Sequence, residues 1–221
     1  MSASSFSSLG KMIKLVMKLF LFLIGVAFSS PQACADSQGA TTLQPAHQHS
    51  VLKVTTDPIT PTIPRVFLSE SHSKQCKVGV GEAFPALKLP DLNGAIIDLA
   101  ALRGERATVV LYWHPDRWMA RTALIDLQRD LVNRFDPRQI AVVGIAVHQT
   151  ASSLPSLLSE AHAEFPQLVD AGGEALAKVG SFALPRIYVL DSEGTIVWFD
   201  IEYSEGTRRE LRQTLDALLV E

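Results

Sequence analysis

The chain has 221 residues, of which 47% are hydrophobic and 19% are charged, and its formal net charge is −3. This length suits one ordinary domain with extensions, and the hydrophobic share is sufficient for a buried core. The small negative charge leaves no sign of a basic face, so we expect no nucleic-acid partner.

The N-terminus has the three-part pattern of a secretory signal. The basic part consists of Lys11, Lys14 and Lys18. The apolar run Leu19–Phe28 is too short for a usual membrane span, and Ala33-Cys34-Ala35 resembles a cleavage site. We therefore predict a signal peptide over residues 1–35, cleavage before Asp36, and an exported protein that is periplasmic or extracellular. Two alternatives stay open: an uncleaved anchor, which would be the chain's contact with the membrane, and a lipoprotein modified at Cys34.

Residues 36–75 are rich in Ser, Thr, Gln, Pro and His, which predicts a flexible or extended tail. Once the signal is removed, Cys76 is the one cysteine left, so no intramolecular disulfide can form. His47, His49 and His72 with Cys76 offer metal-ligand types. Histidines in a polar tail are more often only solvated, so we expect no metal and no cofactor.

Residues 76–221 have the hydrophobic patterns of one α/β domain. A short strand within residues 84–89 is followed by the turn signal Asn93-Gly94 and a returning strand at Ile96–Leu99. Two buried strands, Thr108–Trp113 and Ile140–Val147, flank a helix over Arg117–Phe135. Strand, helix and strand in this order predict a βαβ unit with parallel strands.

The second half of the domain predicts two connecting helices, a hairpin and a last helix. The first helix has Ser152 or Ser153 as its cap and Pro155 in its first turn. The elements that follow are an extended piece at Phe165–Val169, a helix at Glu174–Val179 ended by Gly180, hairpin strands at Ile187–Leu190 and Thr195–Phe199, and a helix whose apolar face holds Leu211, Leu215, Leu218 and Leu219. We therefore predict a mixed central sheet with helices on both faces.

Four stretches carry a resemblance to a known family: Phe84–Gly94, Leu99–Trp113, Phe165–Asp170 and Leu184–Gly194. In this order and spacing they resemble the redoxin branch of the thioredoxin superfamily, which contains the AhpC/TSA peroxiredoxins and the exported TlpA-type thiol-disulfide oxidoreductases. The resemblance implies a thioredoxin-like three-layer α/β sandwich and a cis peptide bond between Leu184 and Pro185.

The chain departs from that family at the redox motif. Aligned without a gap, the C-x-x-C positions of TlpA-like proteins are here occupied by Arg117, Trp118, Met119 and Ala120. In the peroxiredoxin register, Pro115 matches the family's proline, Met119 stands at its threonine, and Thr122 stands at its peroxidatic cysteine. Thiol chemistry needs a thiolate, and neither register supplies one. Cys76 is the remaining candidate thiol, and we interpret it as a free thiol without a catalytic purpose.

Binding can persist without the thiols. In active relatives the cis-proline loop and the helix start form a shallow groove for extended peptide, which the resemblance places here at Leu184, Pro185 and Trp113, with Trp118 and Met119 nearby. The alternative is that Trp113 is a core residue and Trp118 only caps the helix. We therefore expect a non-catalytic module that binds a protein or peptide partner in the cell envelope. The competing hypothesis is a thiol-disulfide oxidoreductase or peroxiredoxin-like antioxidant protein that acts through Cys76.

Overall fold

The computed structural model describes residues 61–181 and 183–220. The predicted signal peptide, its cleavage site and the tail up to residue 60 lie outside these residues, as do Cys34, His47 and His49. Within the described ranges, no helix has the length and apolar character that crossing a membrane requires.

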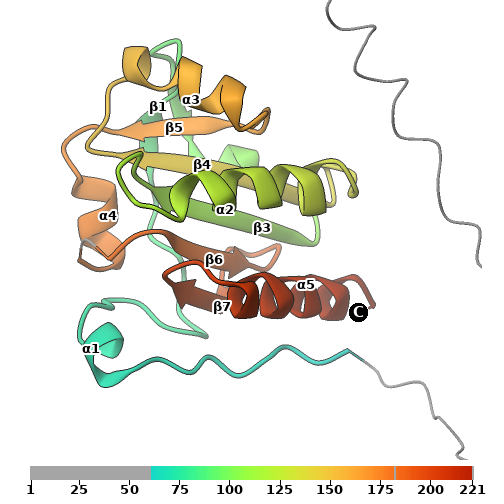
Figure 1. Cartoon of the computed structure of the whole chain (residues 1–221). Helices are drawn as coiled ribbons and strands as arrows, with labels where there is room; N and C mark the ends of the chain where they lie inside the picture. The colour runs from blue at the N-terminus through green and yellow to red at the C-terminus, as the bar shows by residue number, and fades with distance from the viewer. Residues whose placement is uncertain (1–60, 182, 221) are drawn as a thin grey trace, which may run out of the picture. The chain divides into compact units, whose positions relative to one another are not determined.

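A five-stranded sheet forms the centre of the domain, in the order β5-β4-β3-β6-β7 (Figure 1). The strands are β3 (Ala107–Trp113), β4 (Ile140–Val147), β5 (Gln167–Asp170), β6 (Arg186–Leu190) and β7 (Ile196–Ile201). β3 is parallel to β4 and β4 to β5, whereas β6 runs antiparallel to both β3 and β7. All residues of β3 and β4 are buried, as expected for apolar strands covered on both faces. The predicted mixed sheet is confirmed.

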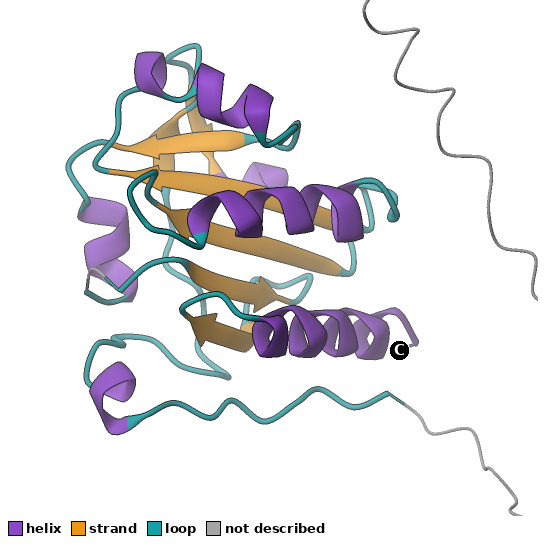
Figure 2. Ribbon diagram, viewed as in Figure 1, coloured by secondary structure: helices purple, strands orange, loops and turns teal. Residues whose placement is uncertain are grey.

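Because successive side chains of a strand point to opposite faces, the sheet supplies two apolar clusters. One face packs against the elements α2 (Ala120–Leu127), its π-helical continuation η3 (Gln128–Val132), α3 (Pro155–Glu160) and α5 (Glu205–Val220). α2 and α5 lie across the front of the sheet in Figure 2. The opposite face packs against α4 (Glu174–Val179) and the region of the hairpin β1 (Lys88–Pro90) and β2 (Ile96–Asp98). The three-layer α/β sandwich is therefore confirmed.

Two helix starts differ from the sequence prediction. The helix expected from Arg117 begins at Ala120, because residues 114–119 form turns. The serine cap predicted for α3 is wrong. Ser153 lies in the 3₁₀ turn η4 (Ala151–Ser153), and its hydroxyl can donate its one proton either to the Thr150 carbonyl (2.8 Å) or to the side-chain oxygen of Gln149 (3.0 Å). Pro155 does occupy the first turn of α3, as predicted.

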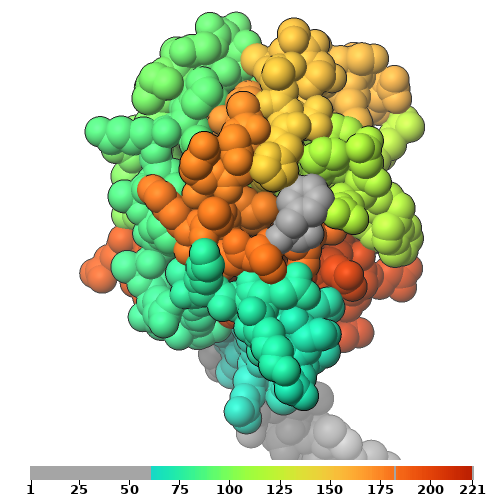
Figure 3. All heavy atoms as spheres, turned by 90° about the vertical axis from the view of Figure 1, so that its left-hand side faces the viewer, coloured from blue at the N-terminus to red at the C-terminus, as the bar shows by residue number. Residues whose placement is uncertain are grey.

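Residues 61–75 were predicted as the end of a flexible tail, but they pack against the domain. The short helix α1 (Glu70–Ser73) is capped by Ser69, and Ile63 and Val66 contact the apolar clusters. The space-filling view shows this cyan stretch lying against the orange surface that includes α4 (Figure 3). Isolated apolar residues among polar ones have no helical or strand period, so the sequence could not reveal this packing.

Candidate functional site

The four residues that the resemblance aligns with C-x-x-C, Arg117 to Ala120, form the turn that leads from β3 into α2. The Arg117 amide donates to the His114 carbonyl (3.0 Å), and the Ala120 amide donates to the Arg117 carbonyl (2.8 Å). Arg117 and Met119 are partly buried, Ala120 is fully buried, and Trp118 is 87% exposed. None of these side chains is a nucleophile. Thr122, the corresponding residue in the other register, places an exposed hydroxyl in the first turn of α2.

A groove of about 620 Å³ lies beside this turn. The Leu184-Pro185 peptide bond is cis, as the resemblance implied. Both residues line the groove together with Arg117, Trp118 and Met119. The remaining lining comes from residues 200–205, where β7 leads into α5. The structure therefore brings the expected groove residues together, with one exception.

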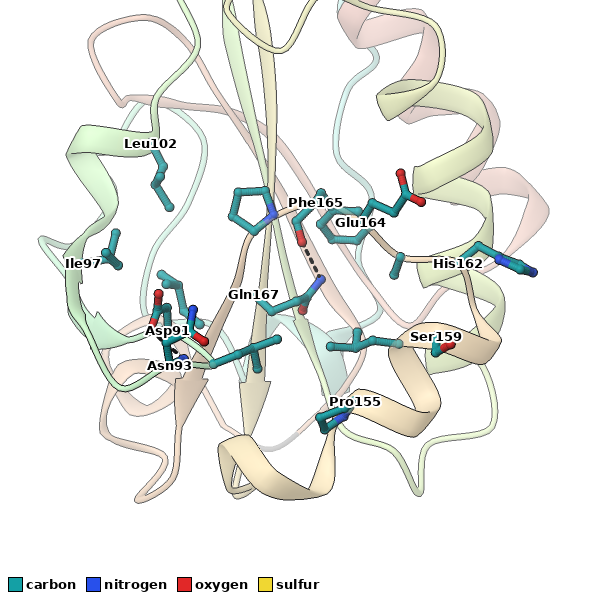
Figure 4. A pocket seen from close by; sticks show the side chains of 15 residues that line it. Asp91, Asn93, Ile97, Leu102, Pro155, Ser159, His162, Glu164, Phe165 and Gln167 are labelled. Atoms are coloured by element: carbon teal, nitrogen blue, oxygen red, sulfur yellow. Dashed lines mark hydrogen bonds between the residues drawn. The ribbon is translucent and has the colours of Figure 1, made fainter.

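That exception is Trp113, which belongs to the core and does not line the groove. Its indole Nε1 donates to Gln167 Oε1 (3.1 Å), and Gln167 Nε2 donates to the Phe165 carbonyl (3.4 Å), as Figure 4 shows for the second bond. The alternative interpretation of Trp113 as a core residue is thus correct. The partner that holds the indole lies 54 residues further along the chain, so local sequence could not distinguish the two interpretations.

Gln167 also lines a second pocket, of about 590 Å³, which no sequence motif indicated. The pocket lies between the β1–β2 loop, with Asp91 and Asn93, and the region of α3 and β5, with Ser159 and His162 (Figure 4). It shares no lining residue with the groove beside Pro185. The two hollows are therefore separate sites.

Three of the lining residues in the stretch 200–205 are acidic: Asp200, Glu202 and Glu205. Asp200 is half-buried, and it accepts hydrogen bonds from the Thr207 hydroxyl (2.7 Å) and the Ile201 amide (2.8 Å). Burial raises the pKa of Asp200 above its ordinary value, although these hydrogen bonds oppose the rise. Glu202 adopts a left-handed conformation (φ 67°), and its amide donates to the Pro185 carbonyl (2.8 Å). This bond ties residues 200–205, which we call the acidic loop, to the cis-proline.

A charged network joins α2 and η3 to α5 next to the groove. The Tyr203 hydroxyl donates to Asp126 (3.2 Å), Arg129 pairs with both Asp126 and Asp130, and Arg208 donates to Asp130. Burial would raise the pKa of Asp130, but the hydrogen bonds from Arg129 and Arg208 outweigh it and hold that pKa well below its ordinary value. Burial and then the charge of Asp126 raise the pKa of Tyr203. The network therefore fixes the helix that follows the acidic loop against the helix that follows Trp118.

Cys76 does not line this groove and lies in a cluster around the fully buried Arg186. The Arg186 guanidinium donates to the Gln75 carbonyl (2.7 Å), the Ala183 carbonyl (3.0 Å) and the Tyr188 hydroxyl (3.2 Å), and it lies 3.9 Å from the Cys76 sulfur. Among the described residues, no hydrogen bond or β-bridge joins Cys76 to residues 117–120.

The backbone of this cluster is tightly packed. Cys76 forms an antiparallel bridge with Gly180, and the partly buried thiol donates to the His72 carbonyl (3.4 Å). A Cβ atom at Gly180 would collide with the Gln75 carbonyl and the Arg186 guanidinium, so the close approach requires glycine. Cys76 packs with Tyr188 on the sheet face opposite to α2.

Comparisons with solved structures agree with this architecture. A putative protein disulfide isomerase from Bacteroides thetaiotaomicron is 21% identical, with a TM-score of 0.61 over 66% of this chain and 94% of that one. A putative thiol:disulfide interchange protein DsbE from Chlorobium tepidum is 19% identical, with a TM-score of 0.55 over 64% of this chain and 99% of that one. Peroxidoxin BcpB from Mycobacterium tuberculosis is 20% identical, with a TM-score of 0.52 over 64% and 96%. At such identities the likeness concerns the fold alone.

The sequence itself has no match among curated proteins. The AhpC/TSA family model matches residues 80–199, which is more than half of the 221 residues and runs from the segment before β1 into β7. With its thioredoxin-like fold and its cis-proline, the chain belongs to the AhpC/TSA family.

Proposed function

We propose that this protein is an exported, non-catalytic binding module, and that it holds an extended protein or peptide segment in the groove beside Pro185. The observation that carries the proposal is the composition of the groove. The residues that line it include an indole that is 87% exposed, but no cysteine. The groove thus offers a binding surface without the reagent for disulfide exchange.

The size and chemistry of the groove suit a polypeptide segment. Its volume of about 620 Å³ lies within the range of about 300–1,000 Å³ typical of ligand sites. Trp118, Met119, Leu184 and Pro185 provide apolar surface, and Trp and Met are effective anchors in interfaces.

The competing hypothesis, thiol chemistry through Cys76, requires the sulfur at the groove. Cys76 instead makes its contacts with His72, Gly180 and Arg186, and it does not line the groove. A thiolate must reach the sulfur that it attacks, so the position of Cys76 favours binding over exchange. The export part of the proposal rests on the signal pattern of residues 1–35, and mass spectrometry of secreted or envelope material should find a mature N-terminus at Asp36.

Peptide binding to the groove can be measured by fluorescence anisotropy. The probe is a fluorescein-labelled, extended decapeptide with apolar residues at alternate positions. We expect Trp118→Ala to weaken binding about tenfold, because buried aromatic anchors contribute most to such interfaces. The free energy of unfolding should change by less than about 0.5 kcal/mol, because the side chain is exposed.

The matched control is Phe67→Ala, which removes another exposed aromatic ring (81%) that does not line the groove. It should leave peptide binding unchanged. Equal affinities of wild type and Trp118→Ala, or no binding by either protein, would overturn the proposed function.

A further inference from the structure

The charge of the groove indicates what kind of segment it takes. Three of the residues that line the groove, Asp200, Glu202 and Glu205, are acidic, whereas Arg117 is the one lining residue with a guanidinium. Even if Arg117 pairs with one of the three, the groove keeps negative charge. Glu202 and Glu205 are exposed, and the Glu202 side chain is 69% accessible. The groove is therefore acidic and reachable from solvent.

The other cationic groups near these helices are held elsewhere. Arg208 and Arg129 pair with Asp130, and Arg121 pairs with Glu160 at 3.5 Å. His72 lies 3.8 Å from Glu202, but it is charged only when protonated. These pairings leave the acidic loop as the dominant charge of the groove at neutral pH.

Glu202 is also held in place by an unusual backbone. A left-handed conformation (φ 67°) is uncommon for a residue other than glycine, and such conformations concentrate at functional sites. The hydrogen bond from the Glu202 amide to the Pro185 carbonyl fixes the loop beside the cis-proline. The backbone of Glu202 is thereby placed next to Pro185, and both residues line the same groove.

Trp118 adds a second feature that favours cations. The negative face of an indole attracts a lysine or arginine head group, and the alkyl stem of such a side chain can cover apolar surface. The groove thus combines carboxylates, an exposed indole and the apolar side chains Met119 and Leu184. This combination matches a cationic residue that is followed or preceded by an apolar one.

Building on the proposed function, we propose that the groove selects extended segments in which lysine or arginine neighbours an apolar residue. The carboxylates contribute selectivity more than affinity, because exposed ion pairs are weak and screened by salt. Acidic segments are excluded by like-charge repulsion. The partner is therefore a protein with a basic, apolar, extended stretch that is accessible in the same compartment.

The test uses three labelled decapeptides with the same alternating leucines and with lysine, glutamine or glutamate at the positions between them. We expect the lysine peptide to bind at least tenfold more tightly than the glutamate peptide at low salt. This difference should shrink in 0.5 M salt, a concentration at which exposed charges are screened within about 5 Å.

Two double variants locate the effect. Glu202→Gln with Glu205→Gln should weaken binding of the lysine peptide about three- to tenfold, as expected for the loss of two exposed ion pairs. Glu105→Gln with Glu193→Gln removes the same charge from exposed positions outside the groove and should leave binding unchanged.

The outcomes separate the two proposals. Equal affinity for the three peptides, combined with a loss in Trp118→Ala, would overturn the charge preference and leave the groove as a peptide site. An equal loss in both double variants would also overturn it, because the effect would then come from net charge. If no peptide binds, the proposed function itself fails, and the charge preference fails with it.

Discussion

Pro185 and Arg186 are neighbours in the chain, yet they belong to two different environments. Pro185 lines an open groove with residues 117–119, whereas the side chain of Arg186 is fully buried beside Cys76. Pro185 lies in the loop before β6, whereas Arg186 is the first residue of the strand, and its side chain lies on the face that also holds Tyr188.

Under the proposed function, the comparison explains how a redoxin fold can present a binding surface without thiol chemistry. The groove has the access that disulfide exchange needs, but no thiol lines it. The Arg186 cluster has the thiol, but there the guanidinium and the bridge to Gly180 hold the N-terminal segment in place. The accessible groove and the Cys76 thiol thus lie in different places, and the following variants test this separation.

The largest effect should come from introducing two cysteines beside the groove. Position 117 is partly exposed and position 120 is fully buried, and one turn hydrogen bond joins their backbones. Arg117→Cys with Ala120→Cys would therefore place one accessible and one shielded thiol at the start of α2, next to Pro185. We expect insulin reduction with dithiothreitol to rise from background to a rate at least tenfold above it.

Arg117→Ser with Ala120→Ser serves as the control for this pair, because it makes the same positions polar without adding thiols. It should stay at background. If the cysteine pair also stays at background in a folded protein, then more than the thiols has been lost from this site.

The next largest effect should come from the buried cluster around Arg186. Arg186→Met leaves the carbonyls of Gln75 and Ala183 without their charged donor, so we expect the free energy of unfolding to fall by about 2–3 kcal/mol. Urea denaturation followed by circular dichroism measures this loss. Arg209→Met, which changes an exposed side chain on α5, should alter stability by less than about 0.5 kcal/mol. Equal stabilities of the two variants would show that the Arg186 cluster is not structural.

A smaller effect should come from Asp130, which joins the helices on either side of the groove. The folded protein holds the pKa of Asp130 below its unfolded value of about 3.9. Its stabilisation is therefore present above about pH 4 and is lost as the pH falls further. Because its arginine partners are partly exposed, we expect Asp130→Asn to cost about 1 kcal/mol at pH 7.

The pH dependence of urea denaturation tests this assignment. The stability difference between wild type and Asp130→Asn should be constant between pH 5 and pH 7 and should narrow towards pH 3. A difference that grows as the pH falls would contradict the lowered pKa of Asp130.

Local sequence predicted the elements well wherever the signals were themselves local. The helix Glu174–Val179 was predicted with its bounds because Gly180 directly follows it, and the buried runs of β3 and β4 needed only their apolar composition. The βαβ order and the hairpin then determined the sheet. The start of α2 was misplaced because apolar spacing does not show where turns end.

The site was predicted less completely because its parts meet only in the folded chain. The sequence indicated Pro185 and residues 117–119, but not the acidic loop that contains Glu202, because the hydrogen bond to the Pro185 carbonyl brings that loop beside them. Trp113 appeared equally suited to groove and core until its partner Gln167 was located. The packing of residues 61–75 depended likewise on a distant residue, Arg186.

The central claim is that the protein has no thiol chemistry of its own, and turnover of wild type and Cys76→Ser tests it most directly. Insulin reduction and peroxide consumption should both remain at the rate of the protein-free control in both proteins. Turnover by the wild type that disappears in Cys76→Ser would contradict the account, because the partly buried Cys76 would then have to reach a substrate from outside the groove.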